Sequence, residues 1–196
     1  MIVYLASNNP HKIVELAALG KPDYLDLRSA REIGGMPQVV EDTGQFSGNA
    51  LKKAAALAVQ APDAWILSDD TGLCVDVLDG APGVETAYFA GPHATYVENR
   101  EKLLRVMQGQ PDRSAVFACV LCLLIQSKAH YFIGTCPGQI LNEPRGSSGF
   151  GYDPIFAPQG HAQSFAEMGT AMKQTLSHRA DAWKKFIAWL DTNRKT

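Results

Sequence analysis

The chain has 196 residues, of which 46% are hydrophobic and 19% are charged, values typical of a globular protein with its own core. A net charge of −2 excludes a surface that is basic overall, so any anion site must be local. No apolar stretch approaches the roughly 20 residues of a membrane helix, and the first residues lack a signal-peptide pattern. We therefore expect a cytoplasmic protein with no membrane or nucleic-acid partner, folded as a single domain over residues 1–196.

Periodicity and turn residues predict alternating strands and helices in the first part of the chain. In chain order we expect strand 2–6, helix 10–19, strand 24–27, helix 51–59, strand 65–68, an extended segment 73–78 and helix 96–107. A hairpin of strands 115–125 and 130–141 follows, with its turn at 127–129, and an amphipathic helix spans 180–190. This order predicts an α/β fold with a mixed β-sheet.

Two adjacent carboxylates, Asp69 and Asp70, follow the apolar run of residues 65–67. Like charges repel, so the pair predicts a cation site at the end of a buried strand. The alternative is a solvated turn, because Asp, Ser, Thr and Gly all favour turns. Glu41 is a third candidate carboxylate, with an ordinary loop acid as its alternative. Mg²⁺ is the expected ion, because it binds one or two carboxylates and bridges substrate phosphates.

Three predicted helices carry basic residues near their starts, where the helix dipole makes cations unfavourable. A shared anion explains this pattern, because backbone N–H groups and cationic side chains together bind phosphate. The alternative is that these side chains are solvated, which we favour for His11 and Lys52. The pattern comprises His11 and Lys12 after a predicted N-cap at Asn9 with Pro10 as the first helical residue, Lys52 and Lys53, and His178 and Arg179 after Ser177.

The segment 149–156, GFGYDPIF, combines glycines with aromatic side chains. Glycine lets the backbone approach a ligand closely, and Phe150 and Tyr152 offer flat faces for a nucleobase. Asp153 offers hydrogen-bond acceptors. The alternative is a turn beside the core with buried aromatics.

Cys119 and Cys122 have a C-x-x-C spacing, which could indicate a metal or redox site. They lie in a β-prone run, however, and strand positions three apart point to opposite faces of a sheet. We therefore expect buried structural thiols.

Six stretches make the chain resemble the inosine triphosphate pyrophosphatase family, which hydrolyses non-canonical purine nucleoside triphosphates. They occur in the family's order and span nearly the whole chain. One departure is Tyr88, at a position where the family often has arginine. The stretches are LASNNPHKIVEL (5–16), FSGNALKKA (46–54), SDDTGLCVDVLDGAPG (68–83), GFGYDPIF (149–156), FAEM (165–168) and KQTLSHRADA (173–182).

The resemblance implies an elongated α/β fold, in which a long central mixed sheet carries two lobes flanking a nucleotide-binding cleft, and it implies a homodimer. It also implies the role of each matching residue. Ser7, Asn8, Asn9, Pro10, His11 and Lys12 bind phosphates; Glu41, Asp69 and Asp70 bind Mg²⁺, with Asp70 as the base that activates water; Lys53, Thr71, Lys173, His178 and Arg179 contact substrate; and Phe150, Gly151, Tyr152 and Asp153 hold the base.

We therefore expect magnesium-dependent hydrolysis of ITP, dITP and XTP to the monophosphate and pyrophosphate, with Lys12, Lys53 and Lys173 offsetting charge on the leaving pyrophosphate. Donors from residues 150–153 and from His178 or Arg179 would select a 6-keto purine. Two alternatives remain: a pyrophosphatase for modified pyrimidine nucleoside triphosphates, and a nucleotide-binding protein without turnover. The D-x-D-x-T spacing of a phosphoaspartate phosphatase is absent from residues 69–71.

Overall fold

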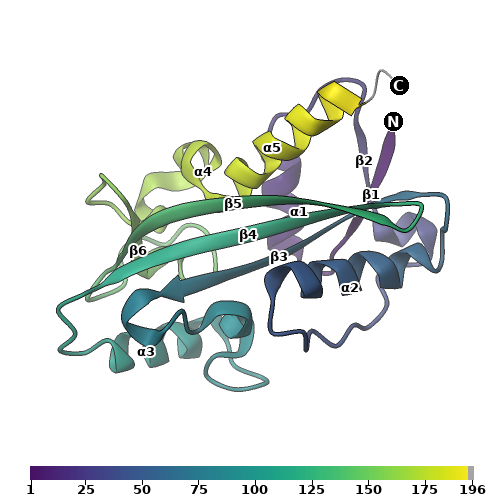
Figure 1. Cartoon of the computed structure of the whole chain (residues 1–196). Coiled ribbons are helices and arrows are strands. Elements are labelled where there is room, and N and C mark those ends of the chain that lie inside the picture. The colour runs from purple at the N-terminus through teal and green to yellow at the C-terminus, as the bar shows by residue number, and fades with distance from the viewer. Residues whose placement is uncertain (194–196) are drawn as a thin grey trace. The chain divides into compact units, whose positions relative to one another are not determined.

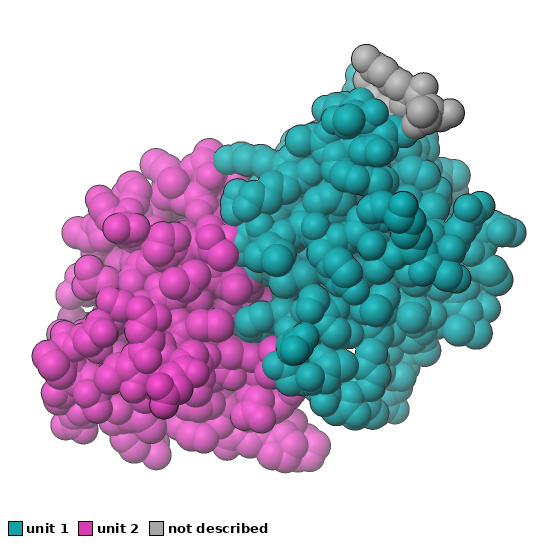
Figure 2. All heavy atoms as spheres, in the orientation of Figure 1, with its two compact units in different colours: residues 1–70, 119–134, 179–196 teal, residues 71–118, 135–178 magenta. Residues whose placement is uncertain are grey.

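The computed structural model describes residues 1–193, which form two compact units (Figure 2). Unit 1 contains residues 1–70, residues 119–134 and the chain from residue 179 onward. Unit 2 contains residues 71–118 and 135–178. The predicted single domain, with a cleft between two lobes, stays a prediction.

The strands form a six-stranded sheet in the order β2-β1-β3-β4-β5-β6 (Figure 1). β1 is parallel to both β2 and β3, whereas β5 and β6 are antiparallel, so the sheet is mixed. This confirms the mixed α/β fold predicted from the order of elements. The strands are β1 (Ile2–Ala6), β2 (Asp26–Ser29), β3 (Trp65–Val75), β4 (Ser114–Ile125), β5 (Lys128–Ile140) and β6 (Phe156–Pro158).

The helices pack on these strands through apolar faces. In unit 1, α1 and α5 share a core with Leu121 and Leu123 of β4, whereas α2 packs with Cys122 and Leu124, so they cover opposite faces of the strand. In unit 2, α3 and α4 share one core with Phe117. No helix within residues 1–193 is both long and apolar enough to cross a membrane. The helices are α1 (Pro10–Ala18), α2 (Phe46–Ala58), α3 (Tyr96–Val106), α4 (Phe165–Leu176) and α5 (His178–Asn193).

The paired aspartates lie inside a strand, not at its tip. β3 runs without a break from Trp65 to Val75, so the predicted end of the strand at Ser68 was wrong, and the alternative of a solvated turn is excluded. Asp69 and Asp70 are buried, at 3% and 5% exposure, and both contact cations. Neutralisation of their charges allows the strand to continue through two acidic residues.

The second helix begins earlier than predicted. α2 starts at Phe46 instead of residue 51, because tertiary contacts override the weak helix propensity of Ser47, Gly48 and Asn49. Lys53 therefore lies two turns inside the helix. The argument that placed Lys52 and Lys53 at a helix N-terminus was wrong, whereas α1 starts at Pro10 as predicted. α5 starts at His178, directly after the predicted cap Ser177 and two residues before the expected helix 180–190.

The second half of the chain differs most from prediction. The hairpin turns at Gln126 and Ser127, both with positive φ, one residue before the predicted turn. β6 and α4 were not predicted, although Ser164 and Glu167 form a capping box that is visible in the sequence.

The cysteine interpretation is confirmed. Cys119 and Cys122 belong to different core clusters, on opposite faces of β4, and neither forms a disulfide. Burial raises the pKa of the Cys122 thiol to about 12, as expected of an inert buried thiol.

Candidate active site

The first part of the site forms where β1 ends beside the middle of the parallel strand β3. Ala6 of β1 is in register with Ser68 of β3, so the loop after β1 and the residues after Ser68 meet at one edge. Asn9 caps α1 as predicted, because its side-chain oxygen accepts hydrogen bonds from the backbone N–H groups of His11 (3.0 Å) and Lys12 (3.4 Å). The cap directs the first turn of α1 toward Asp69.

Asp69 is bound by two cations. Its Oδ2 lies 3.0 Å from Lys12 Nζ and 3.2 Å from a terminal nitrogen of Arg179. The Arg179 guanidinium, 2% exposed, also binds Glu15, one turn after Lys12 on α1. Burial opposes ionisation of Asp69, but Lys12, Arg179 and Lys53 outweigh it and lower the pKa of the carboxyl below its usual range. Asp69 therefore remains an anion that joins α1, β3 and α5.

Asp70 lies in a different environment. Its Oδ1 accepts a hydrogen bond from Lys53 Nζ at 2.8 Å, and the same ammonium lies 2.8 Å from Glu41. Its Oδ2 accepts a hydrogen bond of 3.3 Å from the side-chain amide of Asn49. Burial, helped by Glu41 and opposed mainly by Lys53, raises the pKa of Asp70 to about 6. Of the two adjacent aspartates, Asp70 is the one whose pKa suits proton transfer near neutral pH.

We call these seven residues, all in unit 1, the β3 ion network. It unites six residues predicted from the sequence to bind metal or substrate. Within residues 1–193, no group of three or more His, Cys, Asp or Glu side chains is arranged as a metal site. The network comprises Lys12, Glu15, Glu41, Lys53, Asp69, Asp70 and Arg179.

The donor chemistry of the network nevertheless fits a hard divalent cation. Oxygens of Glu41 and Asp70 converge on one positive centre, Lys53 Nζ. Two convergent carboxylates are the protein contribution that Mg²⁺ commonly uses, with phosphate and water completing its shell. Asp69 already binds two cationic side chains, those of Lys12 and Arg179, through one carboxylate oxygen.

The other residues of the first loop lie outside this network. Ser7 Oγ accepts a hydrogen bond from the Asn9 N–H at 3.2 Å, which closes the loop. Asn8, Pro10 and His11 are exposed, and the Asn8 amide lies 3.5 Å from the Met36 carbonyl. The loop therefore presents polar groups beside Lys12, as the phosphate prediction requires.

The predicted base segment lies in unit 2 and is built around Asp153. The Asp153 carboxylate, 2% exposed as a residue, accepts hydrogen bonds from the Phe150 N–H at 2.9 Å and from Lys173 Nζ at 2.6 Å. Lys173 Nζ also lies 4.9 Å from the centre of the Phe150 ring. Gly149 has φ +78°, and a Cβ there would collide with the Asp153 carboxylate. These contacts fix the position of Phe150, whose ring is partly exposed.

Two of the side chains predicted to contact substrate are buried in unit 2. Tyr152 is 2% exposed and packs in the core of unit 2, so the prediction that its ring offers a face to a base was wrong. Its hydroxyl donates to the Thr86 carbonyl at 3.1 Å. His178 is also buried and stacks on Phe117, with ring centres 4.7 Å apart.

Four residues that the sequence analysis did not select support the site. Glu15 and Asn49 could have been found from helical spacing, since they lie three residues after Lys12 and four before Lys53. Arg100 and Tyr96 carried no such signal. Arg100 donates to the Gly151 carbonyl at 2.8 Å, and the Tyr96 ring centre lies 5.8 Å from that of Phe150.

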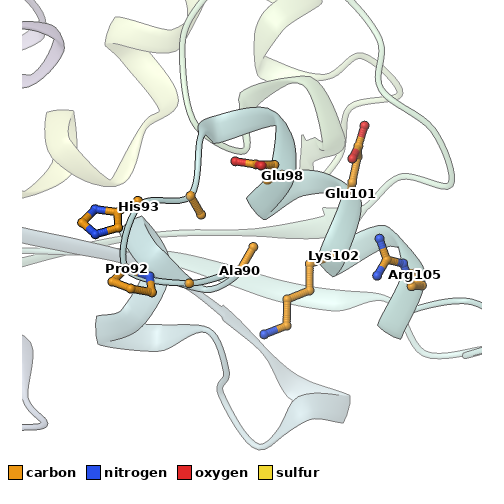
Figure 3. A pocket seen from close by; sticks show the side chains of 9 residues that line it. Ala90, Pro92, His93, Glu98, Glu101, Lys102 and Arg105 are labelled. Carbon is orange, nitrogen blue, oxygen red and sulfur yellow. The ribbon is translucent and has the colours of Figure 1, made fainter.

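A cavity of about 440 Å³ opens elsewhere in unit 2, between residues 90–94 and α3 (Figure 3). His93 projects from the loop, and Lys102 and Arg105 project from the helix. None of the predicted site residues is among its lining residues, all of which lie within positions 90–105. Thr71, beside Asp70 on β3, is half-buried and belongs to unit 2.

Comparison with known proteins gives consistent matches over nearly the full chain. The profile of the Ham1 family matches residues 3–189. A dITP/XTP pyrophosphatase of Opitutus terrae is 53% identical over 96% of this chain and 98% of its own. A dITP/XTP pyrophosphatase of Desulforamulus reducens is 43% identical over 97% and 96%.

Solved structures agree in fold. A Ham1 protein from Coxiella burnetii is 34% identical and superposes with a TM-score of 0.90 over 98% of this chain and 99% of its own. The dITP/XTP pyrophosphatase of Mycobacterium abscessus is 32% identical, with a TM-score of 0.78 over 95% and 99%.

Proposed function

Because the chain belongs to the Ham1 family, we propose that it hydrolyses non-canonical purine nucleoside triphosphates (ITP, dITP and XTP) to the monophosphate and pyrophosphate. The relatives named dITP/XTP pyrophosphatases support this substrate class, since one is 53% identical over nearly its whole length. The observation that carries the proposal is the β3 ion network, where three cations and four carboxylates meet.

Asp70 is the catalytic base in this proposal. A water molecule attacks the α-phosphorus, Asp70 accepts its proton, and the bond to the bridging oxygen breaks so that pyrophosphate leaves. With a pKa of about 6, Asp70 is ionised at neutral pH yet remains basic enough to take the proton. Lys53 Nζ lies 2.8 Å from Oδ1 of Asp70, so Oδ2 of Asp70 is the oxygen that contacts Asn49 and accepts the proton of the water.

The phosphates bind where α1 begins. Lys12 and the loop of residues 7–11 supply donors at a helix N-terminus, which favours anions. Substrate phosphate competes with Asp69 for the Lys12 ammonium, while Arg179 remains on Asp69 and prevents it from being left buried without a partner.

Glu41 and Asp70, with Asp69 as the third predicted carboxylate, hold Mg²⁺ in this proposal. When bound, the ion neutralises phosphate charge and lowers the pKa of a coordinated water. Pyrophosphate release measured with Mg²⁺, with a chelator and after Mg²⁺ is restored tests this. We expect loss and recovery of turnover, and full turnover in the chelator would contradict it.

Phe150 contacts the base in this proposal, and Lys173, which lies 4.9 Å from its ring centre and donates to Asp153, keeps its predicted role of offsetting charge on the leaving pyrophosphate. Donors of residues 150–153, Thr71 and His178 complete the predicted contacts. A 6-keto purine presents an acceptor to these donors, whereas the 6-amino group of ATP presents a donor. An unpaired polar contact of this kind costs on the order of 1–3 kcal/mol.

The deciding experiment is a substrate panel of ITP, dITP, XTP, ATP, GTP and methylated pyrimidine triphosphates with Mg²⁺. We expect monophosphate and pyrophosphate from the first three, and little from ATP. Preferential cleavage of the pyrimidines would favour the alternative pyrophosphatase. Binding of ITP without turnover would favour a nucleotide-binding protein, and release of single phosphates would exclude both pyrophosphatase proposals.

We also propose a cytoplasmic homodimer. The family resemblance supports the dimer, and nucleotide substrates are consistent with the cytoplasm. Light scattering should give about twice the chain mass of 21.2 kDa, and a mass equal to one chain would contradict the dimer.

A further inference from the structure

Asn49 lies between the proposed base and the loop that carries Glu41. It is fully buried on α2. Its Oδ1 accepts a hydrogen bond from the Thr43 N–H at 3.2 Å and lies 2.7 Å from the Thr43 hydroxyl. Its Nδ2 donates to Asp70 Oδ2 at 3.3 Å. One amide therefore bridges a loop residue and the carboxylate of Asp70.

The chemistry of Thr43 determines which way this amide faces. A backbone N–H can only donate, so the atom of Asn49 opposite it must be the carbonyl oxygen. The amide NH₂ must then point to Asp70. Asp70 thus receives one donor on each oxygen, Lys53 on Oδ1 and Asn49 on Oδ2, which fixes the plane of the carboxylate.

Close packing of the loop on α2 keeps Thr43 in place. A Cβ at Gly48 would lie only 2.7 Å from the Thr43 Cβ, so glycine at this position permits the contact. The Thr43 hydroxyl also lies 2.9 Å from the Gln45 carbonyl. The orientation of Asn49 therefore depends on a close contact between the loop and the first turn of α2.

We propose that Asn49 is a positioning residue which, held by Thr43, orients the Asp70 carboxylate for proton abstraction. The inference rests on the proposed function, because it assigns Asn49 to the same reaction. It goes beyond that function by adding a residue that contacts neither substrate nor metal, and that links the loop carrying Glu41 to the base. Misplacement of a catalytic group by about 1 Å can cost on the order of 100-fold in rate.

Three variants test the arrangement in ITP turnover with Mg²⁺. Asn49→Ala should lower kcat by about 100-fold, and Thr43→Val by about 10-fold, because the second keeps the backbone donor and removes only the hydroxyl. Thr43→Ser keeps the hydroxyl and should stay within about 3-fold of the wild type. KM should change by less than about 3-fold in all three, since the groups that bind substrate remain.

Asp42→Asn is the matched control. Asp42 precedes Thr43 in the same loop and binds Lys52 on the same helix at 2.5 Å, but this pair is exposed and does not touch Asp70. We expect kcat within about 2-fold of the wild type. If Asp42→Asn and Thr43→Val lower kcat equally, general attachment of the loop explains the effect and the proposal is wrong.

A double-mutant cycle with Asp70→Asn separates positioning from simple loss of structure. If Asn49 acts through Asp70, Asn49→Ala should not lower the residual rate of Asp70→Asn further. An additional loss of about 100-fold in that background would overturn the proposal. Absence of ITP turnover in the wild type would overturn the proposed function instead. Wild-type turnover with unchanged kcat in Asn49→Ala would overturn only this inference.

Discussion

The two units bury charge in different ways. Unit 1 holds the β3 ion network, in which three cations face four carboxylates and leave one negative charge. Unit 2 holds the buried pair of Lys173 and Asp153, next to the rings of Phe150 and Phe165. A dense network with surplus negative charge suits a bound cation and phosphate chemistry, whereas one pair among aromatic rings suits recognition of a flat, uncharged base.

The largest effect should come from Asp70, the proposed base in unit 1. Asp70→Asn keeps the size of the side chain and removes the proton acceptor. We expect kcat for ITP to fall by about 10²–10⁴-fold, as measured by pyrophosphate release. The thermal unfolding midpoint should stay close to that of the wild type. Near wild-type turnover in this variant would refute the assignment of Asp70.

The second effect concerns stability. It compares the loss of buried ion pairs with the loss of an exposed ion pair, all made by residues of α5. Arg179→Met leaves Asp69 and Glu15 without their guanidinium, so the free energy of unfolding should fall by about 3–5 kcal/mol in urea titrations. Lys185→Met, which breaks the exposed α5 pair with Asp181, should cost less than about 1 kcal/mol. Equal losses would show that burial of the first pair is unimportant.

The third effect belongs to unit 2. Phe150→Ala removes the partly exposed ring, and loss of base stacking is worth about 1–3 kcal/mol, which corresponds to a KM increase of about 5- to 150-fold. kcat should change much less than KM. Tyr131→Ala, which removes an exposed ring from β5, is the control and should leave KM unchanged. A large fall in kcat with unchanged KM would remove Phe150 from base recognition.

The smallest effect is a difference in pH dependence between the adjacent aspartates. The pKa of Asp69 is lowered in the fold, so its stabilising effect is complete above the unfolded pKa of about 3.9 and is lost at more acidic pH. The pKa of Asp70 is raised to about 6, so its ionisation destabilises the fold as the pH rises from about 4 to about 6.

Urea unfolding of Asp69→Asn and Asp70→Asn from about pH 3 to about pH 7 checks these signs. Asp69→Asn should weaken the acid-induced loss of stability. Asp70→Asn should remove a decrease in stability between about pH 4 and about pH 6. The same change in both variants would contradict the opposite pKa shifts.

The sequence predicted local features well wherever one residue type had one physical role. The Asn9 cap, β1, α3 and the opposite facing of Cys119 and Cys122 all follow from local geometry, and the structure confirms them. The sequence analysis failed at β3 and at the start of α2. The continuity of β3 through two aspartates depends on cations from other elements, and the first turn of α2 depends on tertiary contacts that override weak helix propensity. Tyr152 was misassigned for a similar reason, since an aromatic residue in a glycine-rich segment can face either core or solvent.

The sequence by itself determined the mixed α/β fold, the identity of the charged residues and, through six ordered stretches, the family. Only the tertiary structure decided the pairing of those charges: Lys12 and Arg179 with Asp69, and Lys53 with Asp70 and Glu41. The physical reason is that ion pairs form between side chains far apart in the chain, and their distances and burial depend on how strands and helices pack. Those distances and burials lower the pKa of Asp69 and raise the pKa of its neighbour Asp70.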